Sequence, residues 1–161
     1  MCVENALFED NFCEFLPGSG AVGHFKAIGR YGEFTNCIFR DNNAGTSQFV
    51  PGRGALSGIR MKVTSCLFAD NKAFIGGALS CSQSKITDCV FIGNYASDKA
   101  GIVNSSGDTY MLNCTFYDNY AEKQSLFSNI LTGDYYYNNV FSNNRTGDGS
   151  PLFRIVDTIT V

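Results

Sequence analysis

The sequence contains no tryptophan, one histidine and only three prolines among its 161 residues. It also lacks any apolar run of about eighteen residues, so no segment is predicted to cross a membrane as a helix. The net charge is −3, and the lysines and arginines form no cluster. Because nucleic-acid binding requires clustered positive charge, we expect no nucleic-acid partner. The N-terminus has neither the basic start nor the apolar stretch of a signal peptide.

The composition is that of a folded domain. Apolar residues make up 44% of the chain and charged residues 17%, which is typical of a globular protein. The length suits a single domain, and we assign residues 1–161 to it. Seventeen glycines predict many tight turns, and the fourteen phenylalanines are explained by a repeat.

The element Phe-x-x-Asn occurs six times and defines the repeat. Successive copies begin 31, 29, 23, 25 and 25 residues apart. The phenylalanines are Phe8, Phe39, Phe68, Phe91, Phe116 and Phe141, and the asparagines are Asn11, Asn42, Asn71, Asn94, Asn119 and Asn144. A period of this length is typical of a solenoid.

Further columns of similar residues flank each copy. Two residues before the phenylalanine stand Cys37, Cys66, Cys89 and Cys114, and three before it stand Asn, Ser or Asp. A second motif, Gly-Gly-Ala-Leu at residues 76–79, recurs in degraded form in most copies. These columns keep the same register in successive copies, which indicates a true repeat and not a chance similarity.

These columns predict an all-β fold, a right-handed single-stranded parallel β-helix of about six coils. Each repeat consists of short β-prone runs broken by Asn, Asp and Gly, and we expect three strands per coil. Leucine is too sparse for a leucine-rich repeat, and no helical period appears. The phenylalanines should stack inward as a ladder, and the asparagines should bond backbone groups and the equivalent amide one coil away.

Seven cysteines raise the question of disulfides and metal. Equivalent residues on adjacent coils lie ~4.8 Å apart, beyond the ~3.5–4.5 Å between the Cβ atoms of a disulfide. We therefore expect the four column cysteines to be reduced, buried fillers. No Cys-x-x-Cys pair exists and His24 is not placed to join the column, so neither a metal nor another cofactor is expected. Cys2, Cys13 and Cys81 have no assigned role.

Candidate binding residues lie in insertions and turns. The first two copies carry extra residues, at 14–20 and 45–53, and loops on a rigid solenoid are frequent binding sites. Gln48, Phe49 and Arg53 are the candidates in the second insertion. Asp41 and Asp70 belong to a column two residues after the phenylalanine, shared with Asp10 and Asp118. Such carboxylates can bind calcium or act as glycosidase acids, although solvated turn residues explain them more simply.

The functional alternatives remain open at this point. No basic column accompanies the aspartates, and no nucleophile or nucleotide motif appears, so a non-enzymatic protein is favoured. A polysaccharide-active enzyme or carbohydrate-binding β-helix is the alternative, and a purely structural spacer is a third. Val3 and Val161 both fall on one apolar column, so the chain begins and stops in mid-repeat. We expect a segment of a longer array, or open ends that flanking repeats or a partner cover.

The pairing of Phe-x-x-Asn at 68–71 with Gly-Gly-Ala-Leu at 76–79 resembles the repeats of polymorphic outer membrane proteins. These are surface autotransporters of chlamydia-type bacteria, and similar repeats occur in surface proteins of some protists. The resemblance implies a β-helical passenger at the cell surface or secreted, which adheres to a host-cell surface protein or glycan.

Overall fold

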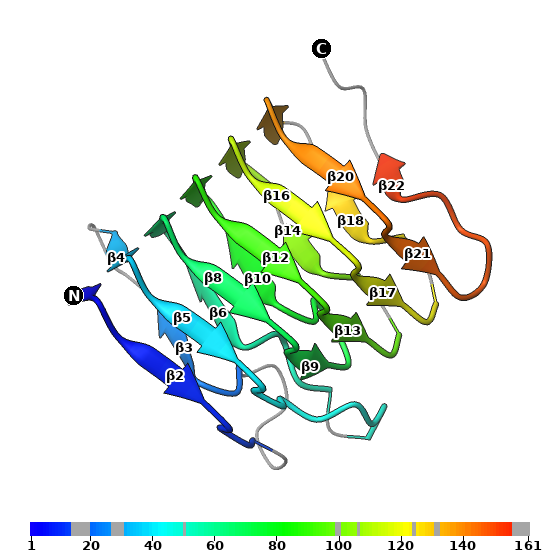
Figure 1. Cartoon of the computed structure of the whole chain (residues 1–161), viewed down its shortest axis with the longest axis horizontal. Helices are drawn as coiled ribbons and strands as arrows, with labels where there is room; N and C mark the ends of the chain where they lie inside the picture. The colour runs from blue at the N-terminus through cyan, green and yellow to red at the C-terminus, as the bar shows by residue number, and fades with distance from the viewer. Residues whose placement is uncertain are drawn as a thin grey trace.

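The computed structural model is a stack of β-strand coils (Figure 1). It describes residues 1–13, 20–26, 31–49, 51–98, 101–105, 107–123, 125–130 and 133–155. Over these ranges the secondary structure is entirely strands, turns and bends. No helix among them is long and apolar enough to span a membrane. The strands form four parallel sheets, so the parallel β-helix predicted from the repeat is confirmed.

Two of the sheets, A and B, carry the strands on either side of the cysteine column. Sheet A consists of β1 (Cys2–Glu4), β4 (Gly32–Thr35), β7 (Met61–Thr64), β11 (Lys85–Thr87), β15 (Tyr110–Leu112) and β19 (Tyr135–Tyr137). Sheet B consists of β2 (Leu7–Glu9), β5 (Ile38–Arg40), β8 (Leu67–Ala69), β12 (Val90–Ile92), β16 (Thr115–Tyr117) and β20 (Val140–Ser142).

Sheets C and D complete each coil. Sheet C consists of β9 (Lys72–Ala73), β13 (Tyr95–Ala96), β17 (Tyr120–Ala121) and β21 (Arg145–Thr146). Sheet D consists of β3 (Gly23–Lys26), β6 (Leu56–Ile59), β10 (Leu79–Ser82), β14 (Val103–Ser105), β18 (Phe127–Ile130) and β22 (Phe153–Ile155).

The number of strands per coil corrects the sequence-based expectation. Three sheets contain six strands each, but only four coils contribute a strand to every sheet, so the described stack has about four complete coils where about six were predicted. In the first two coils sheet C is reduced to the isolated bridges Phe12↔Asn43 and Asn43↔Lys72. A complete coil therefore has four strands, not three. The strands of sheet C are two residues long, too short to produce an alternating pattern in the sequence.

Strand pairing brings equivalent residues of successive coils together. Phe68 pairs with Phe39 on one side and Phe91 on the other. Neighbouring rings of the phenylalanine column stack nearly parallel, with centroids 4.7–5.0 Å apart. The four central rings, Phe39, Phe68, Phe91 and Phe116, are completely buried. Each stacked pair contributes on the order of 1 kcal/mol beyond the burial of its area.

The polar residues at the bends are explained by backbone conformation. Within the described ranges, fourteen non-glycine residues have positive φ, and most belong to two columns. One column is Asn5, Asn36, Ser65, Asp88, Asn113 and Asn138, and the other is Asp10, Asp41, Asp70, Asp118 and Asn143 with Gly93. Asn and Asp tolerate this left-handed region better than other non-glycine residues. Each coil therefore turns its corners with residues suited to the required φ.

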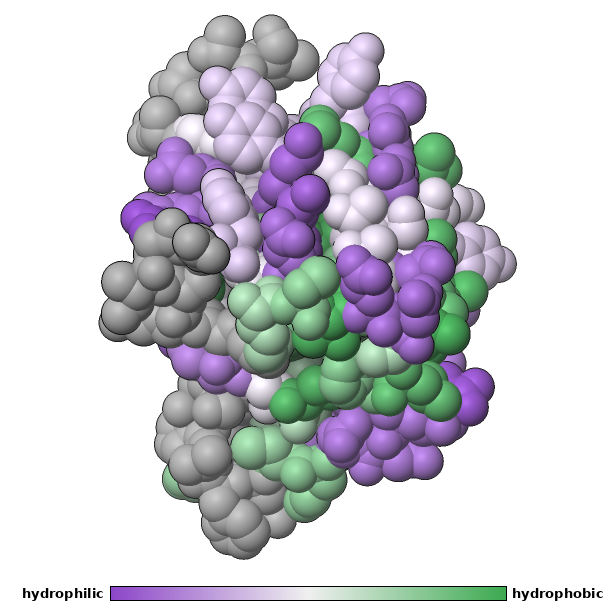
Figure 2. Space-filling view, turned by 90° about the vertical axis from the view of Figure 1, so that its left-hand side faces the viewer, coloured by the Kyte–Doolittle hydropathy of each residue, from purple (hydrophilic) through white to green (hydrophobic). Residues whose placement is uncertain are grey.

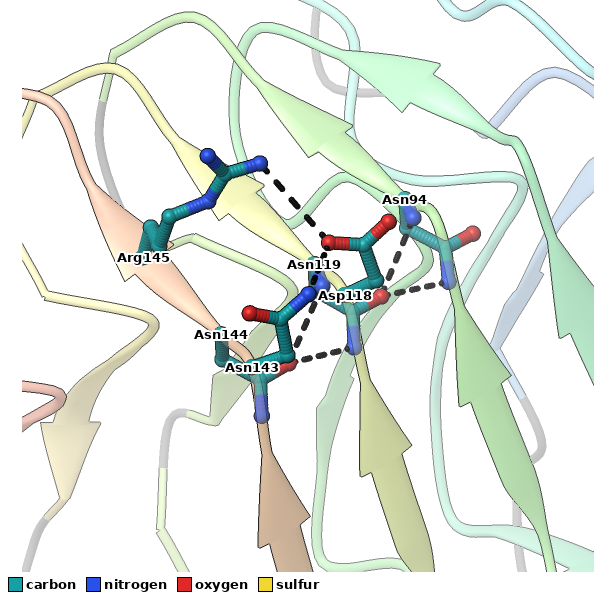
Figure 3. A network of polar contacts seen from close by, with 6 residues as sticks. All are labelled: Asn94, Asp118, Asn119, Asn143, Asn144 and Arg145. Carbon is teal, nitrogen blue, oxygen red and sulfur yellow. Dashed lines mark hydrogen bonds and ion pairs between the residues drawn. The ribbon is translucent and has the colours of Figure 1, made fainter.

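The asparagines of Phe-x-x-Asn form an internal amide ladder (Figure 3). Asn119 Oδ1 accepts both the main-chain and the side-chain N–H of Asn94, each at 3.0 Å. Asn119 Nδ2 in turn donates to the carbonyl of Phe91 at 2.9 Å and to Asn144 Oδ1. These amides are fully buried from Asn42 to Asn119, and no buried side-chain polar atom in the described part of the chain lacks a partner.

The cysteine column lies inside the corner between sheets A and B. Cys37, Cys66, Cys89 and Cys114 are at most 2% exposed, and all seven cysteines are free thiols. Each column thiol donates to the carbonyl two residues earlier, at 3.2–3.3 Å. In the last coil Asn139 replaces the cysteine, and its Oδ1 accepts the main-chain N–H of Cys114 at 2.8 Å. Small polar groups at this column therefore satisfy the strand ends.

Candidate functional site

The aspartate column lies at the corner after sheet B. Asp41 and Asp70 are exposed, and both hold the left-handed conformation that the bend requires. Asp70 Oδ1 occupies the space that a side chain at Gly93 would need. In the same column Asp118 accepts a hydrogen bond from Asn143 Nδ2 at 2.8 Å and pairs with Arg145 (Figure 3). This geometry gives the carboxylates a role in the turn, and a ligand at Asp41 and Asp70 stays a prediction.

No metal centre emerges from the described residues. Among them, no three His, Cys, Asp or Glu side chains are grouped closely enough to hold a metal ion. Unlike the aspartates of that column, Asp134 is buried, and it accepts from Ser105 Oγ at 3.0 Å and from the main-chain N–H of Thr109 at 2.8 Å. Asp134 therefore fixes the corner between sheets D and A.

The described part of the second insertion, residues 45–49 and 51–53, contacts later coils of the stack. Ser97 Oγ donates to the carbonyl of Thr46 at 2.8 Å, which ties this loop to a coil two turns further along the chain. Gln48 and Phe49 lie at its tip, and 83% of Phe49 is exposed. Most of the first insertion, residues 14–19, lies outside the described residues, so a binding role for it stays a prediction.

The end of this loop is held rigidly next to sheet D. The carbonyl of Gly52 accepts from Ile75 N, and Gly54 N donates to the carbonyl of Ile75, both at 3.0 Å. A side chain at Gly52 would collide with the carbonyl of Ala44, so glycine is needed for this close approach. Arg53 lies between the two bonded glycines, and its side chain is exposed. The backbone therefore places Arg53 in a fixed position beside β6.

Arg53 borders a hollow of about 180 Å³ on the outer face of sheet D. The hollow extends across β3, β6 and β10, and three coils therefore contribute to it. Its lining residues are His24, Arg53, Ser57, Gly58, Ile59, Ser80, Cys81 and Ser82. Three serines, a histidine and an arginine give it a polar and partly basic wall. None of the lining residues is a carboxylate.

Two hydrogen bonds organise the outward column of sheet D. Strand register aligns His24 with Ser57, Ser57 with Ser80, and Ser80 with Asn104. His24 Nδ1 and Ser57 Oγ lie 2.8 Å apart, and Asn104 Nδ2 donates to Ser80 Oγ at 3.1 Å. Ser57 is 1% exposed and Ser80 6%, although both point away from the hydrophobic core. Ser57, Ser80 and Asn104 therefore form a row of polar side chains that lies on the side of sheet D away from the core and is nevertheless shielded from solvent.

Cys81 lies beneath the hollow and is not reactive. It is 4% exposed and contacts Thr109 Oγ1 at 4.0 Å. Burial raises the pKa of the Cys81 thiol to about 12, since the thiolate would lose its hydration there. A thiol with such a pKa stays protonated at neutral pH, so it contributes packing and no nucleophile.

Sheet A presents an exposed aromatic group near the last coils. The rings of Tyr110 and Tyr135 stack with centroids 4.9 Å apart, and both are about half exposed. Tyr137, on the same strand as Tyr135, is 74% exposed. Figure 2, which views the molecule from the side of β4 in Figure 1, shows hydrophobic and hydrophilic side chains interleaved on that face. On sheet A the outward column changes along the stack, from Glu33 through Lys62 and Lys85 to Tyr110 and Tyr135.

Sequence reasoning found Arg53 but missed the other polar residues of the hollow. His24 was considered only as a metal ligand, and Ser57 and Ser80 were not singled out. One signal was available, since a polar residue directly follows the leucine of the second motif in both Leu56-Ser57 and Leu79-Ser80. Neither a scan against protein-family models nor a search of curated proteins finds a match for this chain.

Proposed function

We propose that this chain is a non-enzymatic, surface-exposed β-helical scaffold whose outward residues and loops make adhesive contacts. The observation that supports the proposal is the division between the two faces of each strand. The repeated motif residues, such as Phe91 and Asn94, are fully buried and fully hydrogen-bonded or stacked. They hold the scaffold, so any partner must contact the variable outward side chains.

Two exposed groups are the best contacts for a host-cell protein or glycan. Phe49 stands at the tip of the second insertion, and the tyrosines Tyr110, Tyr135 and Tyr137 cover the last coils of sheet A. Exposed aromatic residues on a rigid frame are typical of binding surfaces, because they bury large areas at low entropic cost.

Binding of the purified chain to host cells tests this proposal. Phe49→Ser should reduce saturable binding several-fold if the loop tip is the contact, and a double Tyr110→Ser, Tyr135→Ser variant tests the aromatic group. Phe12→Ser is the matched control, because Phe12 is 62% exposed on a different coil. Equal binding by all variants would exclude these contacts. No binding by the unmodified chain would leave a structural spacer.

A polysaccharide-active enzyme or carbohydrate-binding module is the second candidate. The polar hollow lined by His24, Ser80 and Ser82 favours it, because hydroxyls and an imidazole can hold sugar hydroxyls. Turnover of acidic and neutral polysaccharides by the purified chain, lost in His24→Gln, would support the enzyme. An absence of turnover with retained sugar binding would support the binding module.

A further inference from the structure

The hollow on sheet D contains an arginine, Arg53, that forms no ion pair with any residue that the structure describes. Two described arginines form ion pairs, Arg40 with Glu9 and Arg145 with Asp118. Arg53 takes part in none of the ion pairs found among the described residues. Its guanidinium can therefore donate two hydrogen bonds to an external carboxylate, which is the bidentate geometry that arginine favours.

The hydroxyl groups of the hollow match a polyhydroxylated ligand. Asn104 donates to Ser80 Oγ, so the hydroxyl hydrogen of Ser80 remains for another acceptor. Ser82 is half-buried at the wall, and Ser57 is held by His24. Hydroxyls and an imidazole both donate and accept, as the vicinal hydroxyls of a sugar ring require. A backbone glycine and Ile59 add a small apolar surface for the ring's C–H groups.

Size and rigidity restrict the ligand further. The volume of about 180 Å³ is below the range of roughly 300–1,000 Å³ for pockets that hold drug-sized molecules. The hollow therefore accommodates one ring and not an extended chain. Its walls come from three strands in fixed register and from Arg53, which is held between Gly52 and Gly54. The donors on the strands are therefore positioned before binding, and the exposed side chain of Arg53 is the group that the ligand has to order.

We infer that this hollow binds a carboxylated sugar, with Arg53 on the carboxylate and His24, Ser80 and Ser82 on the ring hydroxyls, while the buried Ser57 orients His24. The inference rests on the proposed adhesive function and names the class of ligand that such a surface recognises. Free acidic monosaccharides and the acidic end units of glycan chains share this chemistry.

Calorimetric titration of the full chain tests the inference. The probes are glucuronate and galacturonate, their neutral counterparts glucose and galactose, acetate, and a short galacturonate oligomer. We expect the acids to bind at least tenfold more tightly than the neutral sugars, and acetate to bind weakly. Arg53→Gln should abolish that preference. Lys85→Gln is the matched control, since it removes one positive charge from an exposed position on sheet A.

A second variant tests whether the loss of preference in Arg53→Gln comes from the missing carboxylate contact or from a general disturbance of the hollow. His24→Gln, on an exposed side chain, should weaken acids and neutral sugars alike, because it affects the ring and not the carboxylate. Equal binding of the oligomer and the monomer identifies a glycan end unit as an accepted ligand, and binding of the monomer alone identifies the free monosaccharide. Equal affinity for acids and neutral sugars, or no binding at all, overturns the inference. Host-cell binding is measured on the same variants, so adhesion that persists without sugar binding refutes only the inference, and sugar binding without adhesion refutes only the proposed function.

Discussion

Asn71 and Asn94, which are 23 residues apart in sequence, bond to each other twice. Asn94 Oδ1 accepts the main-chain N–H of Asn71 at 3.1 Å and its side-chain N–H at 2.9 Å. Both amides are fully buried, so neither donor has water as a substitute. The stability of each coil therefore depends on the asparagine of the next.

Replacing Asn94 by alanine should destabilise the protein by on the order of 3–5 kcal/mol. The change leaves the main-chain and side-chain donors of Asn71 buried without their acceptor, at about 1–3 kcal/mol for each group, and it removes the bonds from Asn94 to the carbonyl of Phe68 and to Asn119. Urea unfolding followed by circular dichroism measures this loss. Asn113→Gly is the control, because Asn113 is exposed and has a positive φ that glycine accepts; it should cost under about 1 kcal/mol. Similar losses for both would contradict the buried ladder.

Phe91→Ala should lower the free energy of unfolding by about 3–5 kcal/mol, since it removes a fully buried ring together with its stacking contacts to Phe68 and Phe116. Val90→Ala serves as the comparison. Val90 belongs to the same strand, but it points outward and is 39% exposed, so we expect a loss of about 1 kcal/mol or less. The same urea titration compares them. If Val90 proved the more costly of the two, the strand would face the other way.

Ser65→Asn should stabilise the chain by roughly 0.5–1 kcal/mol. Ser65 has φ 53° in a column where asparagine prevails, and Asn36 Nδ2 already bonds Asn5 Oδ1 in the same column. Thermal unfolding measures the gain. Ser65→Gly separates the causes, because glycine relieves the backbone without extending the ladder. A gain from glycine as large as that from asparagine would mean that the side-chain bond adds nothing.

Only Cys2 and Cys13 should react rapidly with a thiol reagent in the native protein. Cys2 is exposed and Cys13 partly so, whereas the other five cysteines are buried. Raising the pH to 10 should leave Cys81 unreactive, because its pKa of about 12 keeps the thiol protonated. Counting modified thiols by mass spectrometry, with and without urea, checks both statements. Native labelling of Cys66 or Cys89 would show that the coils open.

The sequence was sufficient to predict the fold because each buried column repeats at a nearly fixed interval. From that period alone Phe91 could be assigned to the interior, and Asn94 could be assigned to a column of amides that bond from coil to coil. The two-residue strands, such as Tyr95–Ala96, could not be predicted, because two residues contain no alternation. Positive φ at Asp70 and Asn113 was also not foreseen, although Asn and Asp in a turn column were a sufficient reason to consider it.

The hollow was beyond sequence reasoning for a different reason. It depends on the register between His24 and Ser57, which are 33 residues apart across an insertion. It also depends on the way the second loop returns to place Arg53 beside β6. Insertions carry no periodic signal, so the residues that they bring together cannot be read from the repeat.

The direction of strand pairing has a mechanical consequence. Every inter-coil hydrogen bond in these parallel sheets runs along the stack, from one coil to the next. Tension applied between the two ends of the stack therefore loads a few bonds at a time and peels coils off in sequence. Each coil of about 25 residues that detaches releases roughly 80 Å of extended chain. Under tension the protein would therefore lengthen in steps, one coil at a time, and would dissipate mechanical work at each step.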